Sequence, residues 1–380
     1  MRYLLNLILV FLLFHCGGHE ESYTVEEIDG VRYVHNVTPL WEEDSKLSIE
    51  FEFKLGVLEG EDDDYIFSRP VDAVCDKDGN IYVLDSGNSE VKKYNAAGIY
   101  VLTIGNRGNG PGEFTAPQKL GIINDTNLYV YEASRRMQIL TFDGEYVDSK
   151  TLMMAMGGAR SNNNGTFVGN IMSFYAMGAD IKGEEDGKDN NLALFNQDGE
   201  LVSSFSNLHN FGEEHATRFG NYLGFDFDKD SYIYVTYRSL NRIEKFSPDG
   251  SLLMYITREL PFKEDYETVI EQIPAMGGRD ARELKTADYT IFSSKGLGVD
   301  SKNRIWVPTY LRQADKDRLE EEVRYSKDLM CYEVYNSESL LLSRIPVDVY
   351  YKYFRVSGDR LFCIDDRYEV CVNVYMIVEK

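Results

Sequence analysis

A short apolar segment recurs six times along the chain, each time directly after a cluster of Asp, Asn, Gly or Ser. Its β-branched and aromatic residues favour a strand. The polar clusters are typical of tight turns, because Asp, Asn and Gly tolerate the left-handed backbone geometry that such turns need. The segments are IYVLD (81–85), LYVYE (128–132), TFVGN (166–170), IYVTY (233–237), IWVPT (305–309) and LFCID (361–365).

A second signature follows the first in most repeats, where an apolar or aromatic residue stands four positions before a Gly. It occurs at Tyr94, Leu140, Phe195 and Phe246, and at Tyr335 with Ser339 in place of the Gly. Each repeat therefore reads strand, tight turn, strand, loop, strand, tight turn, strand. Four antiparallel strands repeated six times predict an all-β fold, a six-bladed β-propeller.

The last repeat is one strand short, because only VCVNVYMIVEK follows LFCID. An unassigned strand pattern, LSIEFEFKLG (47–56), precedes the first repeat and alternates apolar with polar residues. Pairing this segment with the C-terminal strand would close the ring and remove an open sheet edge. We therefore expect the propeller to span 47–380 and a tether and lead-in to span 17–46.

The long connections predict which face of the propeller binds a ligand. In a four-stranded blade, the turns after the first and third strands lie on one face, and the other connections lie on the opposite face. All three long insertions are of the second kind: 171–190, 259–294 and 311–328. Because loops longer than about 12–15 residues are uncommon unless functional or disordered, we predict that this insertion-bearing face is the binding face.

Two of the insertions have a helical pattern of apolar residues. Tyr266, Val269, Ile270 and Ile273 have the i, i+3, i+4, i+7 spacing of one helix face, and Leu319 and Val323 form a shorter i, i+4 pair. We expect short helices in both segments. They would either pack on the rim of the disc or form a wall over its central mouth.

Arginines gather on the same face. Their guanidinium groups suit carboxylates and sulfates, so an anionic ligand is one hypothesis. The alternative is that they pair with acids in the same loops, which include Glu184, Glu185, Asp186, Asp315 and Asp317. The candidate binding residues are Arg69, Arg135, Arg238, Arg312 and Arg367, and Arg107, Arg136 and Arg242 share the face.

The segment from Pro70 to Phe114 resembles an NHL repeat, and its GNGPGEF ending is similar to that of bacterial six-bladed β-propeller lipoproteins. The stretch IDGVRYVHN (28–36) also resembles the segment before the first blade in that group. The resemblance covers nearly all of the mature chain and is strongest in the first, second and fourth blades. It implies the same six-bladed propeller that the repeats predict.

The N-terminus is typical of an export signal. Arg2 precedes an apolar run from Leu4 to Phe14, too short to span a bilayer, which needs about 20 apolar residues. The following Cys16 resembles the lipidation site of bacterial lipoproteins, although His15 stands where that family prefers a small residue. An ordinary cleaved signal or an uncleaved anchor are the alternatives. The resemblance implies an exported protein in which residues 1–16 form the signal segment and only the N-terminus anchors it to the membrane, facing the periplasm or the cell surface.

Charge excludes one class of partner. Lys and Arg number 40 against 63 for Asp and Glu, and the formal net charge is −23. This charge would repel a phosphate backbone, so we expect no nucleic-acid binding.

Four cysteines remain after Cys16: Cys75, Cys331, Cys363 and Cys371. Cys363 and Cys371 flank a short turn, so they would form either a cross-strand bridge or two buried free thiols.

Metal chemistry has little support in the residue types. The propeller body contains only His209 and His215, whereas a catalytic zinc normally needs three protein ligands. The D-x-D-x-D run that begins at Asp226 has Tyr237 at its twelfth position, where a calcium loop supplies Glu. We assign no metal ligands and expect no cofactor, with Ca²⁺ left open.

The leading hypothesis is a non-enzymatic binding or scaffold propeller, a monomer that recognises a glycan, peptide or protein partner through the insertion-bearing face. The alternative is a divalent-metal-dependent hydrolase or lyase, lactonase-like, with its site in the central channel. Converging carboxylates or amides at the channel mouth would favour the enzyme. Aromatics and arginines around a broad, shallow opening would favour the binder.

Overall fold

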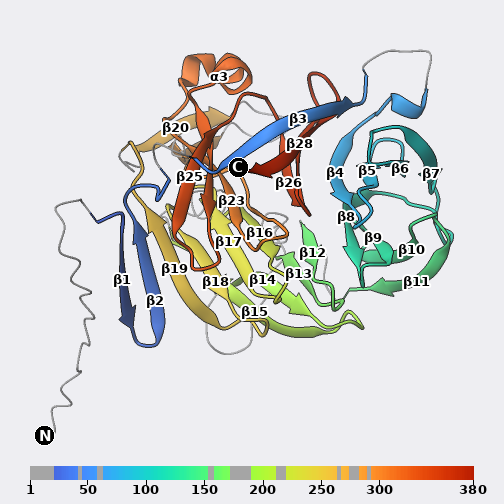
Figure 1. Ribbon diagram of the computed structural model, residues 1–380, viewed down its shortest axis with the longest axis horizontal. Helices are drawn as coiled ribbons and strands as arrows, with labels where there is room; N and C mark the ends of the chain where they lie inside the picture. The colour runs from blue at the N-terminus through green and yellow to red at the C-terminus, as the bar shows by residue number, and fades with distance from the viewer. Residues whose placement is uncertain are drawn as a thin grey trace, which may run out of the picture.

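The six repeated segments form the second strands of six antiparallel sheets, which are arranged in a ring (Figure 1). The computed structural model describes residues 21–41, 45–57, 63–152, 158–171, 190–210, 220–262, 267–273, 282–288 and 292–380. The predicted six-bladed propeller with four-stranded blades is confirmed.

Each blade contains four strands. In the first five blades the strand numbers increase from the central channel outward. The first blade is β4 (Pro70–Cys75), β5 (Ile81–Asp85), β6 (Glu90–Tyr94) and β7 (Tyr100–Ile104). The second is β8 (Pro117–Ile123), β9 (Asn127–Glu132), β10 (Arg136–Thr141) and β11 (Tyr146–Thr151). The third is β12 (Ala159–Ser161), β13 (Phe167–Asn170), β14 (Asn190–Phe195) and β15 (Leu201–Asn207).

The other half of the ring repeats this order. The fourth blade contains β16 (Leu223–Phe227), β17 (Ile233–Tyr237), β18 (Ile243–Phe246) and β19 (Leu252–Arg258). The fifth is β22 (Gly298–Val299), β23 (Ile305–Tyr310), β24 (Met330–Tyr335) and β25 (Leu341–Pro346). The sixth is β26 (Tyr353–Ser357), β27 (Arg360–Asp365), β28 (Cys371–Glu379) and β3 (Leu47–Leu55).

Ring closure follows the sequence prediction. The N-terminal strand β3 pairs antiparallel with the C-terminal strand β28, with Phe53 opposite Val374 and Leu55 opposite Val372. Leu55 is buried in the core that the first and sixth blades share. The sixth blade is therefore complete only because the two ends of the propeller chain meet in it.

Turn chemistry accounts for the polar clusters before each second strand. In the first blade, Asp76 Oδ1 accepts the N–H groups of Asp78 and Asn80 at 3.0 and 2.9 Å, and Oδ2 accepts the Tyr82 hydroxyl at 3.0 Å. In the fourth blade, Asp228 accepts the hydroxyl of Tyr234 at 3.3 Å in the same way. The carboxylates of Asp76 and Asp228 are thus engaged within their turns.

The Gly of the second signature is required by its backbone. Gly98 has a φ of +77°, and a Cβ there would approach the Phe53 ring of the neighbouring blade to 2.9 Å. Ser339, which replaces the Gly in the fifth blade, also has a positive φ of 71°. The tight turn between the third and fourth strands therefore keeps its left-handed geometry in both blades.

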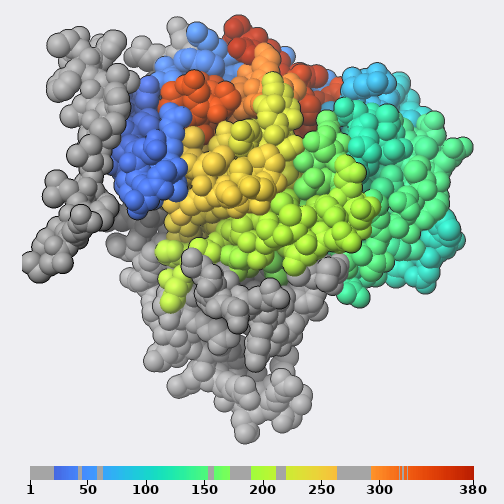
Figure 2. All heavy atoms as spheres, turned by 90° about the horizontal axis from the view of Figure 1, so that it is seen from below, coloured from blue at the N-terminus to red at the C-terminus, as the bar shows by residue number. Residues whose placement is uncertain are grey.

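A hairpin precedes the propeller on its rim. β1 (Tyr23–Ile28) and β2 (Val31–Asn36) form this hairpin, and β2 pairs parallel with β19, which extends the fourth blade to six strands. Figures 1 and 2 show the blue hairpin beside the fourth blade. The hairpin lies within residues 17–46, for which we expected a tether and lead-in, and every residue of β1 is exposed.

The helix predicted around Val269 is wrong. β20 (Glu267–Ile273) pairs antiparallel with β21 (Arg282–Asp288) instead. Several β-branched residues in β20 favour a strand, and a short apolar run fits both periods. Tyr266 lies outside the described residues. The second predicted helix is confirmed as α3 (Leu319–Tyr325), which follows a 3₁₀ turn, η2 (Lys316–Arg318). Another 3₁₀ turn, η1 (Asp63–Tyr65), precedes the first blade.

The cysteines in the described part of the chain are free thiols. Cys363 lies opposite Asn373 and Cys371 opposite Asp365, so the two cysteines are not cross-strand neighbours. Of the two alternatives left by the sequence, the structure has the buried thiols. Among the described residues, no helix has the length and apolar character that crossing a membrane requires.

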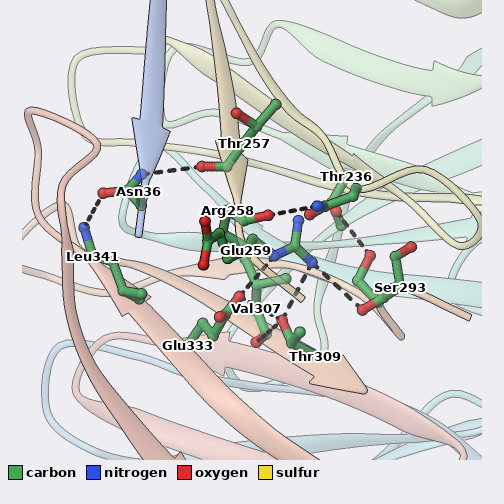
Figure 3. Close-up of polar contacts among 12 residues, drawn as sticks. Asn36, Thr236, Thr257, Arg258, Glu259, Ser293, Val307, Thr309, Glu333 and Leu341 are labelled. Carbon is green, nitrogen blue, oxygen red and sulfur yellow. Dashed lines mark hydrogen bonds and ion pairs between the residues drawn. The ribbon is translucent and has the colours of Figure 1, made fainter. Parts of the chain in front are cut away.

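A buried ionic network joins the fourth and fifth blades (Figure 3). The side chain of Arg258 is fully buried, and its Nε lies 2.7 Å from Glu333 Oε2. Thr309 donates to the same oxygen at 2.9 Å, and Arg344 Nε donates to Oε1 at 3.0 Å. Breaking a buried pair by removing one partner costs about 3–5 kcal/mol, because the other charge stays buried. The network therefore holds these two blades in one relative position.

The closure makes a stability prediction. Leu55→Ala should lower the free energy of unfolding by about 2–5 kcal/mol, because it opens a cavity in the core between the first and sixth blades. Glu50→Ala, at an exposed position of the same strand, should change it by less than about 0.5 kcal/mol. Guanidinium unfolding of both variants checks this. Equal effects would show that β3 is not part of the cooperative ring.

Candidate functional site: the central cavity

The first strands of the blades surround a cavity of about 410 Å³ at the centre of the ring. Its lining comes from β4, β8, β12, β16 and β26 and from the segments that lead into the first strands. A second, overlapping cavity of about 550 Å³ continues toward the ends of β17 and β23. These second-strand ends and first-strand starts belong to the insertion-bearing face, so the cavity opens toward the face that the loop lengths predicted.

Five charged residues lie together in the channel, each on the first strand of a different blade; we call them the charged girdle. They are Asp72 (β4), Lys119 (β8), Arg160 (β12), Asp226 (β16) and Arg355 (β26). Arg160 Nη1 lies 3.0 Å from Asp72 Oδ2, and Arg355 Nη1 lies 3.7 Å from Asp226 Oδ1. With three cations and two carboxylates, the girdle carries one surplus positive charge.

Lys119 is the cation without a carboxylate of its own. Its Nζ lies 5.7 Å from the centre of the Tyr353 ring, and within the described ranges it makes no hydrogen bond or ion pair. Burial lowers the pKa of Lys119 to about 8, and the nearby Asp72 carboxylate offsets only part of that effect. The pKa of Asp72 itself is lowered, because Arg160, Lys119 and Arg355 outweigh the opposing effect of burial. Asp72 is therefore ionised at neutral pH.

Three more cations stand nearer the mouth. Lys295 donates a hydrogen bond to the Tyr351 carbonyl oxygen, and burial lowers its pKa to about 8. Lys352 lines both cavities and donates to Asp366 Oδ2 at 2.8 Å. Arg238 lines the second cavity, and its guanidinium lies 4.1 Å from the centre of the Phe292 ring. The mouth thus adds positive charge to that of the girdle.

Aromatic side chains supply much of the apolar wall. Phe225, Tyr353 and Phe354 line the inner cavity together with Tyr222, which is 45% exposed. Asn170 adds an amide. Apolar and aromatic walls with a few polar groups are typical of small-ligand sites.

Of the five arginines named from the sequence, Arg238 lies in the cavity lining. Arg312 pairs with Glu322 at 2.6 Å and Asp328 at 2.8 Å, so for this residue the alternative of local acidic partners is correct. Arg69 donates to Ser86 Oγ at 2.8 Å, and Arg367 lies 5.2 Å from the Tyr368 ring centre. Those three and Arg135, which is exposed with a φ of 73°, line neither cavity. A ligand role for them stays a prediction.

The sequence interpretation missed Lys119, Arg160, Lys295 and Arg355. A signal was available, because the third residue is charged in three first strands: PVD at 70–72, PQK at 117–119 and YFR at 353–355. Aligning the first strands would have revealed it. Loop length points to the connections between strands, whereas Lys119, Arg160 and Arg355 lie on first strands at the axis.

Metal ligands do not gather in this cavity. Within the part of the chain that the structure describes, no three His, Cys, Asp or Glu side chains are placed to hold a metal ion together. The two girdle carboxylates each face an arginine instead. The described residues therefore offer the lactonase-like alternative no ligand set in the channel.

Comparison with known proteins supports the fold. A family model, DUF5128, described as a six-bladed β-propeller, matches residues 26–259. The chain belongs to this family. No curated protein matches the sequence of this DUF5128 chain significantly.

Two solved structures resemble the DUF5128 chain, both with a TM-score of 0.53. One is a Bacteroides fragilis protein predicted to be exported, 10% identical, with 92% of this chain and 100% of that chain covered. The other is a member of the DUF4221 family from Bacteroides vulgatus, 8% identical, with 88% and 99% covered. At such low identity the similarity concerns the fold alone.

The cavity lysines should titrate apart from the exposed ones. After reductive ¹³C-methylation, the N-methyl signals of Lys119 and Lys295 should titrate near pH 8, because burial disfavours their charged forms. Solvent-exposed lysines as a class should titrate near the ordinary value of about 10.4. Lys119→Arg and Lys295→Arg assign the two signals by removing them. If the signals of Lys119 and Lys295 titrate at the same pH as those of the exposed lysines, the two cavity lysines are not desolvated.

Proposed function

We propose that this propeller is an exported, lipid-anchored binding module that takes an anionic glycan, peptide or protein segment at the mouth of its central cavity. The observation that carries the proposal is the positive charge of the residues that line the cavity. The chain has a formal net charge of −23, yet Lys119, Arg160, Lys295 and Lys352 line its central hollow. A cationic cavity in an acidic protein concentrates anions there and repels them elsewhere.

Binding rather than hydrolysis is favoured by the partners of the girdle carboxylates. Asp72 and Asp226 are engaged by Arg160 and Arg355, which leaves neither one free to act with a metal ion. The aromatic walls supply apolar contact area, and the lysines supply charge. This combination suits recognition of an anionic group on a larger scaffold.

The N-terminal anchor of the proposal rests on Cys16 at the end of the apolar run. Residues 17–22 would join a lipidated Cys16 to β1, which lies on the rim beside the fourth blade. Such a tether attaches the disc by its edge and leaves the centre of the ring clear of the attachment point.

Anchoring can be tested by metabolic labelling with an alkyne fatty acid in a bacterial host. The wild-type protein should incorporate the label and fractionate with membranes, and Cys16→Ser should do neither. Cys75→Ser is the matched control, because Cys75 belongs to the folded propeller. Label in the Cys16→Ser protein, or none in the wild type, would contradict lipidation.

The binding site can be tested by thermal shift. Polygalacturonate and poly-glutamate should raise the unfolding midpoint and neutral dextran should not, with the same result in EDTA and in CaCl₂. Lys295→Met should reduce the shift because it removes a cavity cation, whereas Lys77→Met, at an exposed position, should leave it unchanged. A response that needs Ca²⁺ and disappears with EDTA would favour the metal-dependent alternative. No response to either polyanion would sink the proposal.

A further inference from the structure

The charged girdle has donor groups that the protein leaves without acceptors. Arg160 uses Nη1 for Asp72 Oδ2 and for the Ala159 carbonyl oxygen. Within the described ranges its other guanidinium nitrogens have no partner, and Lys119 Nζ has none. Both side chains line the cavity. An acceptor group of a ligand at this point would receive charge-assisted hydrogen bonds from these donors.

Arg355 is the third cation of the charged girdle. Its side chain is only 12% exposed, and its Nε and Nη1 are buried without a hydrogen-bond partner in the described structure. Among the described residues, its ion pair is with Asp226, at 3.7 Å. Lys119, Arg160 and Arg355 therefore share two carboxylates, Asp72 and Asp226.

The charge count selects the anionic group. One surplus positive charge matches a monoanion, and the planar edge of a guanidinium beside an ammonium matches the two oxygens of a carboxylate. A phosphate monoester carries nearly two negative charges at neutral pH. The girdle alone would balance one of these charges and leave the other close to Asp72 and Asp226, so a dianion would depend on Lys295, which also lines the cavity.

The volume of the central cavity limits the size of the molecule that could present the carboxylate to the girdle. About 410 Å³ is room for a small ring-shaped molecule rather than a folded partner. Phe225, Tyr353 and Phe354 line the cavity with aromatic rings, and Asn170 and Tyr222 add an amide and a hydroxyl group to the lining. Flat faces mixed with amide and hydroxyl groups suit a hydroxylated ring.

We infer that the central cavity binds a sugar acid, with the carboxylate against Lys119 and Arg160 and the sugar ring against the aromatic wall. This inference rests on the proposed function and names the ligand class of that site. Lys119 and Arg160 are the specificity-determining residues, because they distinguish the acid from the neutral sugar.

Calorimetric titration of the intact protein with D-glucuronate, D-glucose and glucose 6-sulfate tests the assignment. Glucuronate should bind at least tenfold more tightly than either of the others. Lys119→Gln should weaken glucuronate binding about tenfold or more, in line with loss of a charge-assisted hydrogen bond. Lys119→Arg should retain binding, and Lys77→Gln should match the wild type.

A second variant with the opposite expected effect separates loss of charge from loss of fold. Asp72→Asn keeps an oxygen acceptor for Arg160 and adds one net positive charge to the girdle, so glucuronate should bind more tightly than to the wild type, which an unfolded variant could not produce. Unchanged or weaker binding in Asp72→Asn, or unchanged binding in Lys119→Gln, would overturn the assignment. Two further ligands test the class of molecule. If glucose 6-sulfate, or the carboxylate-bearing peptide N-acetyl-dialanine titrated in the same way, binds as tightly as glucuronate, the assignment to a sugar acid is wrong. The thermal-shift test of the proposed function is separate. If polyanions still raise the unfolding midpoint and Lys295→Met still reduces that rise, the proposed binding function stands although the sugar-acid assignment fails.

Discussion

Antiparallel pairing between β3 and β28 joins the two ends of the propeller chain, and the central cavity exists only because that ring is closed. The residues that line the cavity come from several blades, so no single blade forms the site. Closure brings Asp72 near the start of the ring and Arg355 near its end into one electrostatic cluster. The fold therefore couples the stability of an outer-strand pairing to the integrity of a site at the centre.

The distribution of charge is the second constraint. The protein carries many more acids than bases, and tight turns engage several of them in local hydrogen bonds, as at Asp76 and Asp228. The charged girdle at the propeller axis has a net positive charge instead. Burial of Lys119 without a carboxylate partner disfavours folding, and a strongly perturbed titratable group in a cleft is a marker of a functional site. We therefore propose that the girdle is a recognition site rather than a structural ion-pair network.

Much of the architecture could be predicted from the sequence, because turn chemistry and strand period repeat six times. The closure could be predicted because LSIEFEFKLG had no partner and the last repeat lacked a strand. The strand β20 could not, since Val269, Ile270 and Ile273 fit a helical stripe as well as a short strand. The site itself depends on which first-strand residues meet at the axis. Arg238 was found because it ends a second strand at the mouth, whereas Lys119 and Arg160 lie inside strands whose neighbours only the closed ring defines.

The most direct measurement is a crystal structure of the protein grown with D-glucuronate. The account predicts the sugar in the central cavity, with its carboxylate oxygens within hydrogen-bond distance of Lys119 Nζ and the Arg160 guanidinium. Glucuronate bound only at rim arginines such as Arg69 or Arg135, or an empty central cavity at saturating ligand, would contradict it.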